Sequence, residues 1–195
     1  MSDDEFQCPD PSILVERCVA HFRSQPDRLA KASLGAACEQ WLNTELFLAY
    51  NFIEPSIFVE TMWACTEDKK IDLAIVRGST KPYQLYGYVE NKAVYANGKH
   101  AGPIYNLSLQ LHRAKDGVIN QAPRLGFIFS CWSSYWRCEH SAFIERVEFS
   151  IQKTFATTTA MRLPCISLTD RTTLQWQMDR PEVEVCLHPI VFHPR

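Results

Sequence analysis

The sequence predicts a single α/β domain in which a central mixed sheet is flanked by helices. Two observations support this prediction. Helical and strand-like periods follow one another in the order helix, three strands, helix, strand, helix, strands. No internal repeat and no linker divides the 195 residues. We therefore expect one domain over residues 1–195, with its core at about residues 28–131 and helical and strand extensions at both ends.

Two helices are expected before the sheet. Residues 10–23 repeat apolar side chains at helical spacing. Pro26 predicts the start of a longer helix over residues 28–51, because the missing N–H of proline costs little in the first helical turn.

Glu45 is the acidic candidate on the longer helix. It lies between Leu42 and Ala49 of the apolar stripe at the i+3 and i+4 spacings, so we expect its carboxylate at the edge of the core. Glu39 is the neighbouring candidate, one half-turn less favourably placed. The alternative is that Glu45 belongs to the ordinary polar border of an amphipathic helix.

Three strands are expected next, as a meander over residues 57–65, 71–76 and 86–95 with polar turns between them. The rest of the chain predicts a helix from Pro103 to about residue 114, a strand over 125–131 covered on both faces, a helix over 140–155, and one or two strands between 172 and 192.

The strand at residues 86–95 carries the most informative charges. Period two places on one face Tyr86, Tyr88, Glu90, Lys92 and Val94. Asp72 is the one acid of the preceding strand. Charges are rare in strands this apolar unless something pairs them. Two adjacent strands that carry Asp72, Glu90 and Lys92 are therefore a suitable frame for binding a divalent metal ion.

Each of these residues also has an ordinary interpretation. Glu90 and Lys92 could form an ion pair on an exposed sheet edge, which would contribute little stability. Asp72 could be an acid near a turn that accepts hydrogen bonds from backbone amides. The sequence favours the metal-site interpretation because aromatic and β-branched neighbours indicate a covered strand.

Composition and charge limit the function classes. The chain is 46% hydrophobic, which is enough for a sizeable core. The formal net charge of −2 means that any contact with nucleic acid must come from a local patch. The acidic N-terminus lacks the regions of a signal peptide, and no apolar run approaches a membrane span. We expect a cytoplasmic protein without a membrane partner.

The eight cysteines are scattered, without a C-x-x-C pair or a paired Cys/His zinc spacing. The six histidines likewise show no ligand spacing. The spacing therefore favours reduced core thiols and gives no indication of a zinc site.

The order α-β-β-β-α-β, with Asp72 followed by Glu90-Asn91-Lys92, resembles the PD-(D/E)xK nuclease superfamily and its restriction-endonuclease-like fold. The resemblance covers roughly residues 36–131. Glu45 lies on the helix before the sheet, where such proteins often carry an acid, and Gln110 on the helix after the Glu-x-Lys strand, where some branches place a glutamine. Ile71 stands where many members have proline.

The resemblance implies a Mg²⁺ or Mn²⁺ ion held by the carboxylates of Asp72 and Glu90 and by the main-chain carbonyl of Asn91. Such an ion polarises a phosphate oxygen and lowers the pKa of a bound water. Lys92 would orient the attacking water and offset charge in the transition state. Glu45 would bind a second ion or fix the first ligands, and Gln110 would contact the phosphate or the water.

Two functional hypotheses follow. The first is a metal-dependent nuclease that acts on DNA in defence, repair or mobile-element biology. The second is a catalytically inactive module of the same fold that serves binding or assembly. The complete Asp72, Glu90 and Lys92 set favours the first. A homodimer and a protein partner that supplies targeting both remain open. A basic region is expected from Lys69, Lys70, Arg77, Lys81, Lys99, His100, Arg113 and Lys115.

Overall fold

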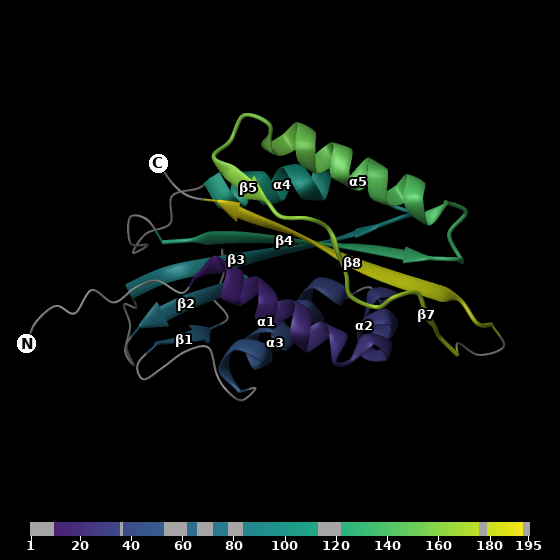
Figure 1. Cartoon of the computed structure of the whole chain (residues 1–195), viewed down its shortest axis with the longest axis horizontal. Coiled ribbons are helices and arrows are strands. Elements are labelled where there is room, and N and C mark those ends of the chain that lie inside the picture. The colour runs from purple at the N-terminus through teal and green to yellow at the C-terminus, as the bar shows by residue number, and fades with distance from the viewer. Residues whose placement is uncertain are drawn as a thin grey trace, which may run out of the picture.

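A computed structural model describes residues 10–35, 37–52, 62–65, 72–77, 84–112, 122–175 and 179–192. These residues form three layers, with a mixed β-sheet between helices α1 to α3 on one face and helices α4 and α5 on the other (Figure 1). The predicted α/β class with a mixed sheet flanked by helices is confirmed. Within the described residues, no helix has the length and apolar character needed to cross a membrane.

The first helical layer consists of α1 (Pro11–Arg23), α2 (Pro26–Ser33) and α3 (Cys38–Asn51). The prediction of one helix over residues 28–51 is wrong, because α2 ends at Ser33 and α3 begins at Cys38. The Ser33 hydroxyl donates to the carbonyl of Ala30 at 2.8 Å, and Gly35 closes a turn on the carbonyl of Ala32 at 2.9 Å. Glycine weakens a helix interior, so this is a natural place for the helix to end.

The first half of the sheet is built from β1 (Met62–Cys65), β2 (Leu73–Arg77), β3 (Gln84–Tyr95) and β4 (Arg124–Ser133). The first three strands pair as an antiparallel meander. Strand β4 then pairs with β3 in parallel, after a crossover through α4 (Ala101–His112). The order helix, three strands, helix, strand that the sequence predicts is present from α3 to β4.

The C-terminal half contributes α5 (His140–Phe155), β5 (Ala160–Arg162), β6 (Ile166–Ser167), β7 (Thr172–Thr173) and β8 (Glu182–Phe192). Strand β8 pairs with β4, and the three short strands pair with β8. The described residues thus form an eight-stranded sheet with the path β1-β2-β3-β4-β8-β5. Strands β5 and β6 were not predicted, because two or three residues show no periodicity.

A bulge in β3 reverses the face of one aromatic residue. Ile75 pairs with Gly87 but Val76 pairs with Leu85, so Tyr86 is an extra residue in the β2–β3 ladder. Tyr86 therefore packs in the core beneath α1 to α3, whereas Tyr88 packs beneath α4 and α5. The prediction that Tyr86 and Tyr88 share a face is wrong.

Gly126 of β4 allows α4 to approach the sheet closely. A Cβ atom at this position would lie 2.9 Å from Leu111 Cδ1 and 3.1 Å from Leu107 Cδ2, both on α4. Gly126 is the register partner of Glu90 on β3. The packing of α4 against Gly126 therefore sets the space above the strand that carries the predicted site.

Candidate active site at the edge of strand β3

The structure brings Asp72 to the segment that carries the Glu-x-Lys residues. Leu73 pairs with Val89, and extending this register by one residue sets Asp72 opposite Glu90. The Oδ2 atom of Asp72 accepts a hydrogen bond from the backbone N–H of Asn91 at 2.7 Å. The predicted neighbours are thus adjacent, at the point where β2 begins.

Helix α3 covers the edge of β3 beyond this point. The Oε1 atom of Glu39 accepts from the backbone N–H of Ala93 at 3.0 Å, and its Oε2 atom lies 3.6 Å from the Nζ of Lys92. The side-chain amide of Asn91 also donates to Asn43 of α3. Glu39 of α3 therefore satisfies a backbone N–H that a neighbouring strand would otherwise pair.

The charges of the site are covered. Glu90 is 0% exposed, the side chain of Lys92 is 15% exposed, and Asp72 is half-buried. Glu90 and Lys92 are therefore not an exposed ion pair on the sheet edge. Buried charges persist in proteins when they are paired or bind an ion.

The pKa of the Tyr88 hydroxyl indicates how well the region next to Glu90 is solvated. Burial raises the pKa of the Tyr88 hydroxyl to about 12, against the opposing influence of the Arg124 guanidinium and with a further contribution from the Glu90 carboxylate. The same hydroxyl donates to the carbonyl of Leu111 on α4 at 3.4 Å. Glu90 thus shares a poorly solvated region with Tyr88 beneath α4.

Glu45 lies elsewhere. Its Oε2 atom is 2.8 Å from His21 Nε2 and accepts from Gln25 at 3.0 Å, and its Oε1 atom lies 2.7 Å from Arg28. Its side chain is 2% exposed. Glu45 therefore joins α1, α2 and α3, and the acid of α3 that reaches β3 is Glu39. This corrects the placement expected for Glu45 as a second metal ligand.

Gln110 lies on α4 above the same strand. Its backbone carbonyl is 3.5 Å from the hydroxyl of Tyr88, two residues from Glu90. Its side-chain oxygen is buried and accepts no hydrogen bond from the residues that the structure describes. The structure records no contact between this side chain and the described atoms of Asp72 or Glu90, so its predicted contact with substrate stays a prediction.

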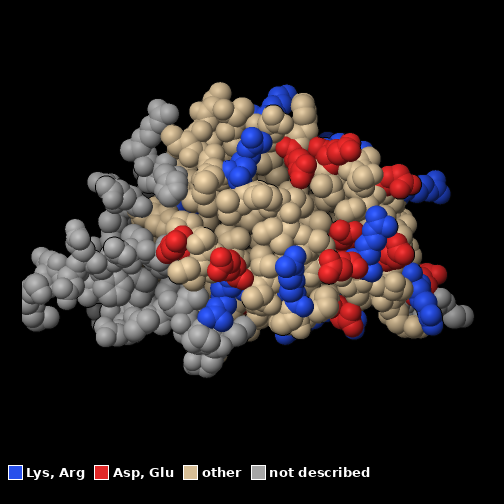
Figure 2. Space-filling model, in the orientation of Figure 1, with Lys and Arg blue, Asp and Glu red and all other residues tan. Residues whose placement is uncertain are grey.

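A cavity of about 300 Å³ borders the site at the N-terminus of α3, lined by Ala37, Glu39, Gln40 and Tyr95. Of the basic region expected from the sequence, Lys69, Lys70, Lys81, Arg113 and Lys115 lie outside the described residues. On the face in Figure 2, Lys and Arg alternate with Asp and Glu over the described surface, without an area of one sign.

The donor set at β3 suits a hard cation. Asp72 and Glu90 are carboxylates, and Asn91 contributes a main-chain carbonyl between Glu90 and Lys92. The two described groups that bring three candidate ligand atoms within 4.8 Å of one another lie elsewhere in the fold. They are His140 with Glu184 and Cys186, and Glu148 with Cys165 and His188.

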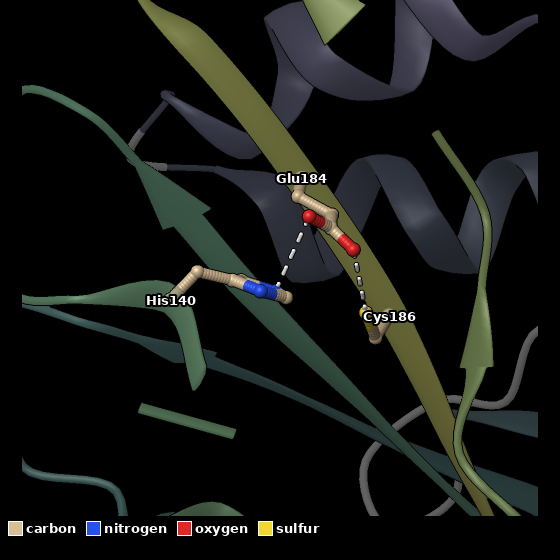
Figure 3. A group of neighbouring side chains, drawn as sticks. All are labelled: His140, Glu184 and Cys186. Carbon is tan, nitrogen blue, oxygen red and sulfur yellow. Dashed lines mark hydrogen bonds and ion pairs between the residues drawn. The ribbon is translucent and has the colours of Figure 1, made fainter. Parts of the chain in front are cut away.

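The first of these groups is an ion-pair network (Figure 3). The Oε2 atom of Glu184 lies 3.4 Å from His140 Nε2 and accepts from Arg171 at 3.1 Å. Its Oε1 atom is 3.8 Å from the sulfur of Cys186. Arg171 also lies over the ring of Trp132 at 5.7 Å. Arg171, from the segment between β6 and β7, therefore balances the charge of Glu184, and the contact of His140 with Glu184 joins the start of α5 to β8.

The second group contains an activated thiol. A hydrogen bond from Cys186 lowers the pKa of Cys165 to about 5, assisted by His188 and opposed by burial. The same contact raises the pKa of Cys186. Sequence spacing missed this pair, because the two cysteines are brought together by strand pairing rather than by a short motif.

No family model, curated protein or solved structure matches this chain. The candidate site is therefore argued from its own geometry and chemistry.

Proposed function

We propose that this chain is a metal-dependent nuclease of the PD-(D/E)xK type that hydrolyses phosphodiester bonds in DNA. The observation that carries the proposal is the 2.7 Å hydrogen bond from the Asn91 N–H to Asp72, which joins the β2 acid to the backbone between Glu90 and Lys92. The path from α3 to β4, with an antiparallel meander and a parallel fourth strand, supports a restriction-endonuclease-like core.

The residues at β3 divide the work of hydrolysis. Asp72, Glu90 and the carbonyl of Asn91 would hold Mg²⁺ or Mn²⁺, which supplies Lewis-acid polarisation of a phosphate oxygen and a bound water of lowered pKa. Lys92 donates a hydrogen bond to the attacking water and stabilises the negative charge that develops on the phosphate oxygens. The cover of α3 and α4 keeps these charges in a region where electrostatic interactions are strong.

Glu39 is the positioning residue for Lys92. At 3.6 Å its carboxylate is close enough to orient the ammonium group, while its other oxygen is fixed by the backbone of Ala93. We therefore assign to Glu39 of α3 the role beside the metal site that the sequence assigns to Glu45.

A catalytically inactive binding or assembly module is the second candidate. The complete burial of Glu90 and the engagement of Lys92 by Glu39 favour it, because both leave less room for a metal ion and a phosphate. Such a module would bind DNA or a protein partner without cleaving a phosphodiester bond.

The test is cleavage of plasmid and linear DNA with Mg²⁺, with Mn²⁺ or with EDTA. We expect metal-dependent cleavage that Asp72→Asn and Lys92→Ala abolish. The matched control is Lys153→Ala, which removes an exposed lysine from the last turn of α5. Equal cleavage by the two site variants would assign the activity to a contaminant. Inactivity together with tight DNA binding would favour the module.

The products also distinguish a monomer from a pair of subunits. Two copies that act together place two clefts on one particle and convert a plasmid directly to linear DNA. A monomer accumulates nicked circles first. Repeating the assay with RNA decides between the two nucleic acids.

A further inference from the structure

A second β-bulge aims Cys165 at helix α5. Arg162 pairs with Ile190 and Ile166 pairs with Leu187, so the three residues 163–165 lie opposite the two residues 188 and 189. Leu163 and Ile166 both pack toward the core under α1 to α3. The residues between them, Pro164 and Cys165, line a cavity with side chains of α5 on the other face. Bulges often re-aim a side chain in this way.

Three potential ligands meet at this bulge, and a further thiol lies beside them. The sulfur of Cys165 lies 3.7 Å from His188 Nε2. The carboxylate of Glu148, on α5, lies within 4.8 Å of both atoms. Cys186, two residues before His188 on β8, lies beside Cys165 but belongs to the group around Glu184, whose Oε1 atom is 3.8 Å from its sulfur. The donors therefore come from one helix, one bulge and one strand.

Their spacing fits a tetrahedral zinc ion. Zinc binds sulfur at about 2.3 Å and imidazole nitrogen at about 2.0–2.1 Å, so a tetrahedral angle separates the two ligand atoms by roughly 3.6 Å. The observed separation between Cys165 and His188 is 3.7 Å. We propose that Cys165, His188 and Glu148 form a binding site for Zn²⁺, with the fourth position open, separate from the nuclease site proposed at β3.

The chemistry of the donors selects the ion. A thiol and an imidazole are soft or borderline ligands, which favour zinc over magnesium and calcium. The carboxylate of the group around Glu184 is instead already paired with Arg171.

The surroundings allow an ion to enter and hold it in place. A cavity of about 200 Å³ is lined by Glu148, Cys165 and His188, and Glu148 is exposed. His188 is buried, and its Nε2 atom is 2.9 Å from the hydroxyl of Ser130. On binding, His188 exchanges this contact for the ion, while Ser130 keeps its 3.4 Å hydrogen bond to the carbonyl of Cys186. Bound zinc would tie α5 to β8.

The experiment is titration of the reduced full-length protein with Co²⁺ and Zn²⁺. We expect Co²⁺ to give the visible spectrum of a tetrahedral site with a thiolate charge-transfer band, which one equivalent of Zn²⁺ abolishes. Cys165→Ser and His188→Ala are expected to weaken zinc binding at least tenfold, the lower limit that even loss of an outer-shell partner usually costs. Circular dichroism confirms that the variants are folded.

Two controls make the outcome decisive. Cys138→Ser removes a thiol that contacts Arg146 outside the cluster and should leave zinc affinity unchanged. Asp72→Asn should leave the thiolate charge-transfer band and its loss with Zn²⁺ unchanged, because the donor set at β3 contains no thiol, so failure of the nuclease proposal would not imitate failure of this one. A cobalt spectrum of the unaltered protein without a thiolate band would overturn the proposal, with no dependence on any variant. So would zinc affinity that is equal in Cys165→Ser and Cys138→Ser.

Discussion

The edge of β3 and the bulge opposite β8 are built from different donors and assembled in different ways. At β3, two carboxylates and an ammonium come from neighbouring strand positions, with Glu39 reaching in from α3. At the bulge, an imidazole comes from β8, a thiol from the segment before β6, and a carboxylate from α5. The first set suits a hard cation and the second a soft one.

The difference teaches what local pattern can and cannot reveal. Glu90 and Lys92 are two residues apart on one strand, so strand periodicity alone puts them together. Cys165 meets His188 only because an extra residue in the ladder turns its side chain over. A bulge leaves no periodic pattern in the sequence, so the site at the bulge cannot be predicted before the strand pairing is known.

The largest expected effect is the loss of cleavage in Asp72→Asn, which tests whether the two regions bind different metal ions. Asp72→Asn should lower Mg²⁺-dependent cleavage by roughly 100- to 1,000-fold, the range for loss of one group that stabilises the transition state. Its zinc content, measured by elemental analysis, should equal that of the unaltered protein, because Asp72 contacts β3 and not the bulge.

The comparison would break if zinc and cleavage fell together in Asp72→Asn while the protein remained folded. The two regions would then be one functional unit. Cys138→Ser serves as the control for both measurements, since its thiol lies at the start of α5, away from both donor sets.

The sequence predicted the order of elements and the strand-borne part of the candidate site because both follow from short-range periodicity. It did not predict which of the two acids on α3, Glu39 or Glu45, reaches β3. A continuous helix over residues 28–51 would carry one phase throughout, but the break after Ser33 separates α2 from α3. Helix α1 then packs against α3 and supplies His21 to Glu45. Such tertiary contacts have no local signature.

Replacing each of the two acids of α3 by glutamine should therefore affect stability to different extents. Glu45→Gln should lower the free energy of unfolding by roughly 1.5–3 kcal/mol, because it weakens hydrogen bonds to a buried carboxylate. Glu39→Gln should change stability by less than about 1 kcal/mol, since the Glu39 side chain is 43% exposed. Urea unfolding measures both.

Cleavage should show the reverse order, with the larger loss in Glu39→Gln because Lys92 loses its partner. If Glu45→Gln impaired cleavage while leaving stability unchanged, Glu45 would belong to the active site after all. Matching losses in both variants would mean that α3 acts only as a support for the sheet.

The packing of α4 over β3 can be tested at two glycines. Gly126→Ala should cost about 1–3 kcal/mol of stability, because its methyl group meets Leu107 and Leu111. Gly102→Ala, on the same helix α4, meets no atom within 4 Å and should raise stability by roughly 0.5 kcal/mol. Thermal unfolding distinguishes the two. Equal stability of both variants would show that α4 yields easily and does not confine the space above Glu90.

The smallest expected effect concerns Tyr88 at alkaline pH. Its pKa is raised from 10.0 to about 12 in the folded protein, so the unfolded chain loses this proton first as pH rises. The unfolded state then binds fewer protons than the folded state, and stability falls between these two values. Tyr88→Phe should make the fall in stability with pH shallower than in the unaltered protein. A decline persists in this variant from Tyr50 and Tyr95, whose pKa values burial also raises. Urea unfolding across this range measures the slope. An identical slope in Tyr88→Phe would mean that the region shared by Tyr88 and Glu90 is well solvated, and the buried environment claimed for the β3 carboxylate would then be lost.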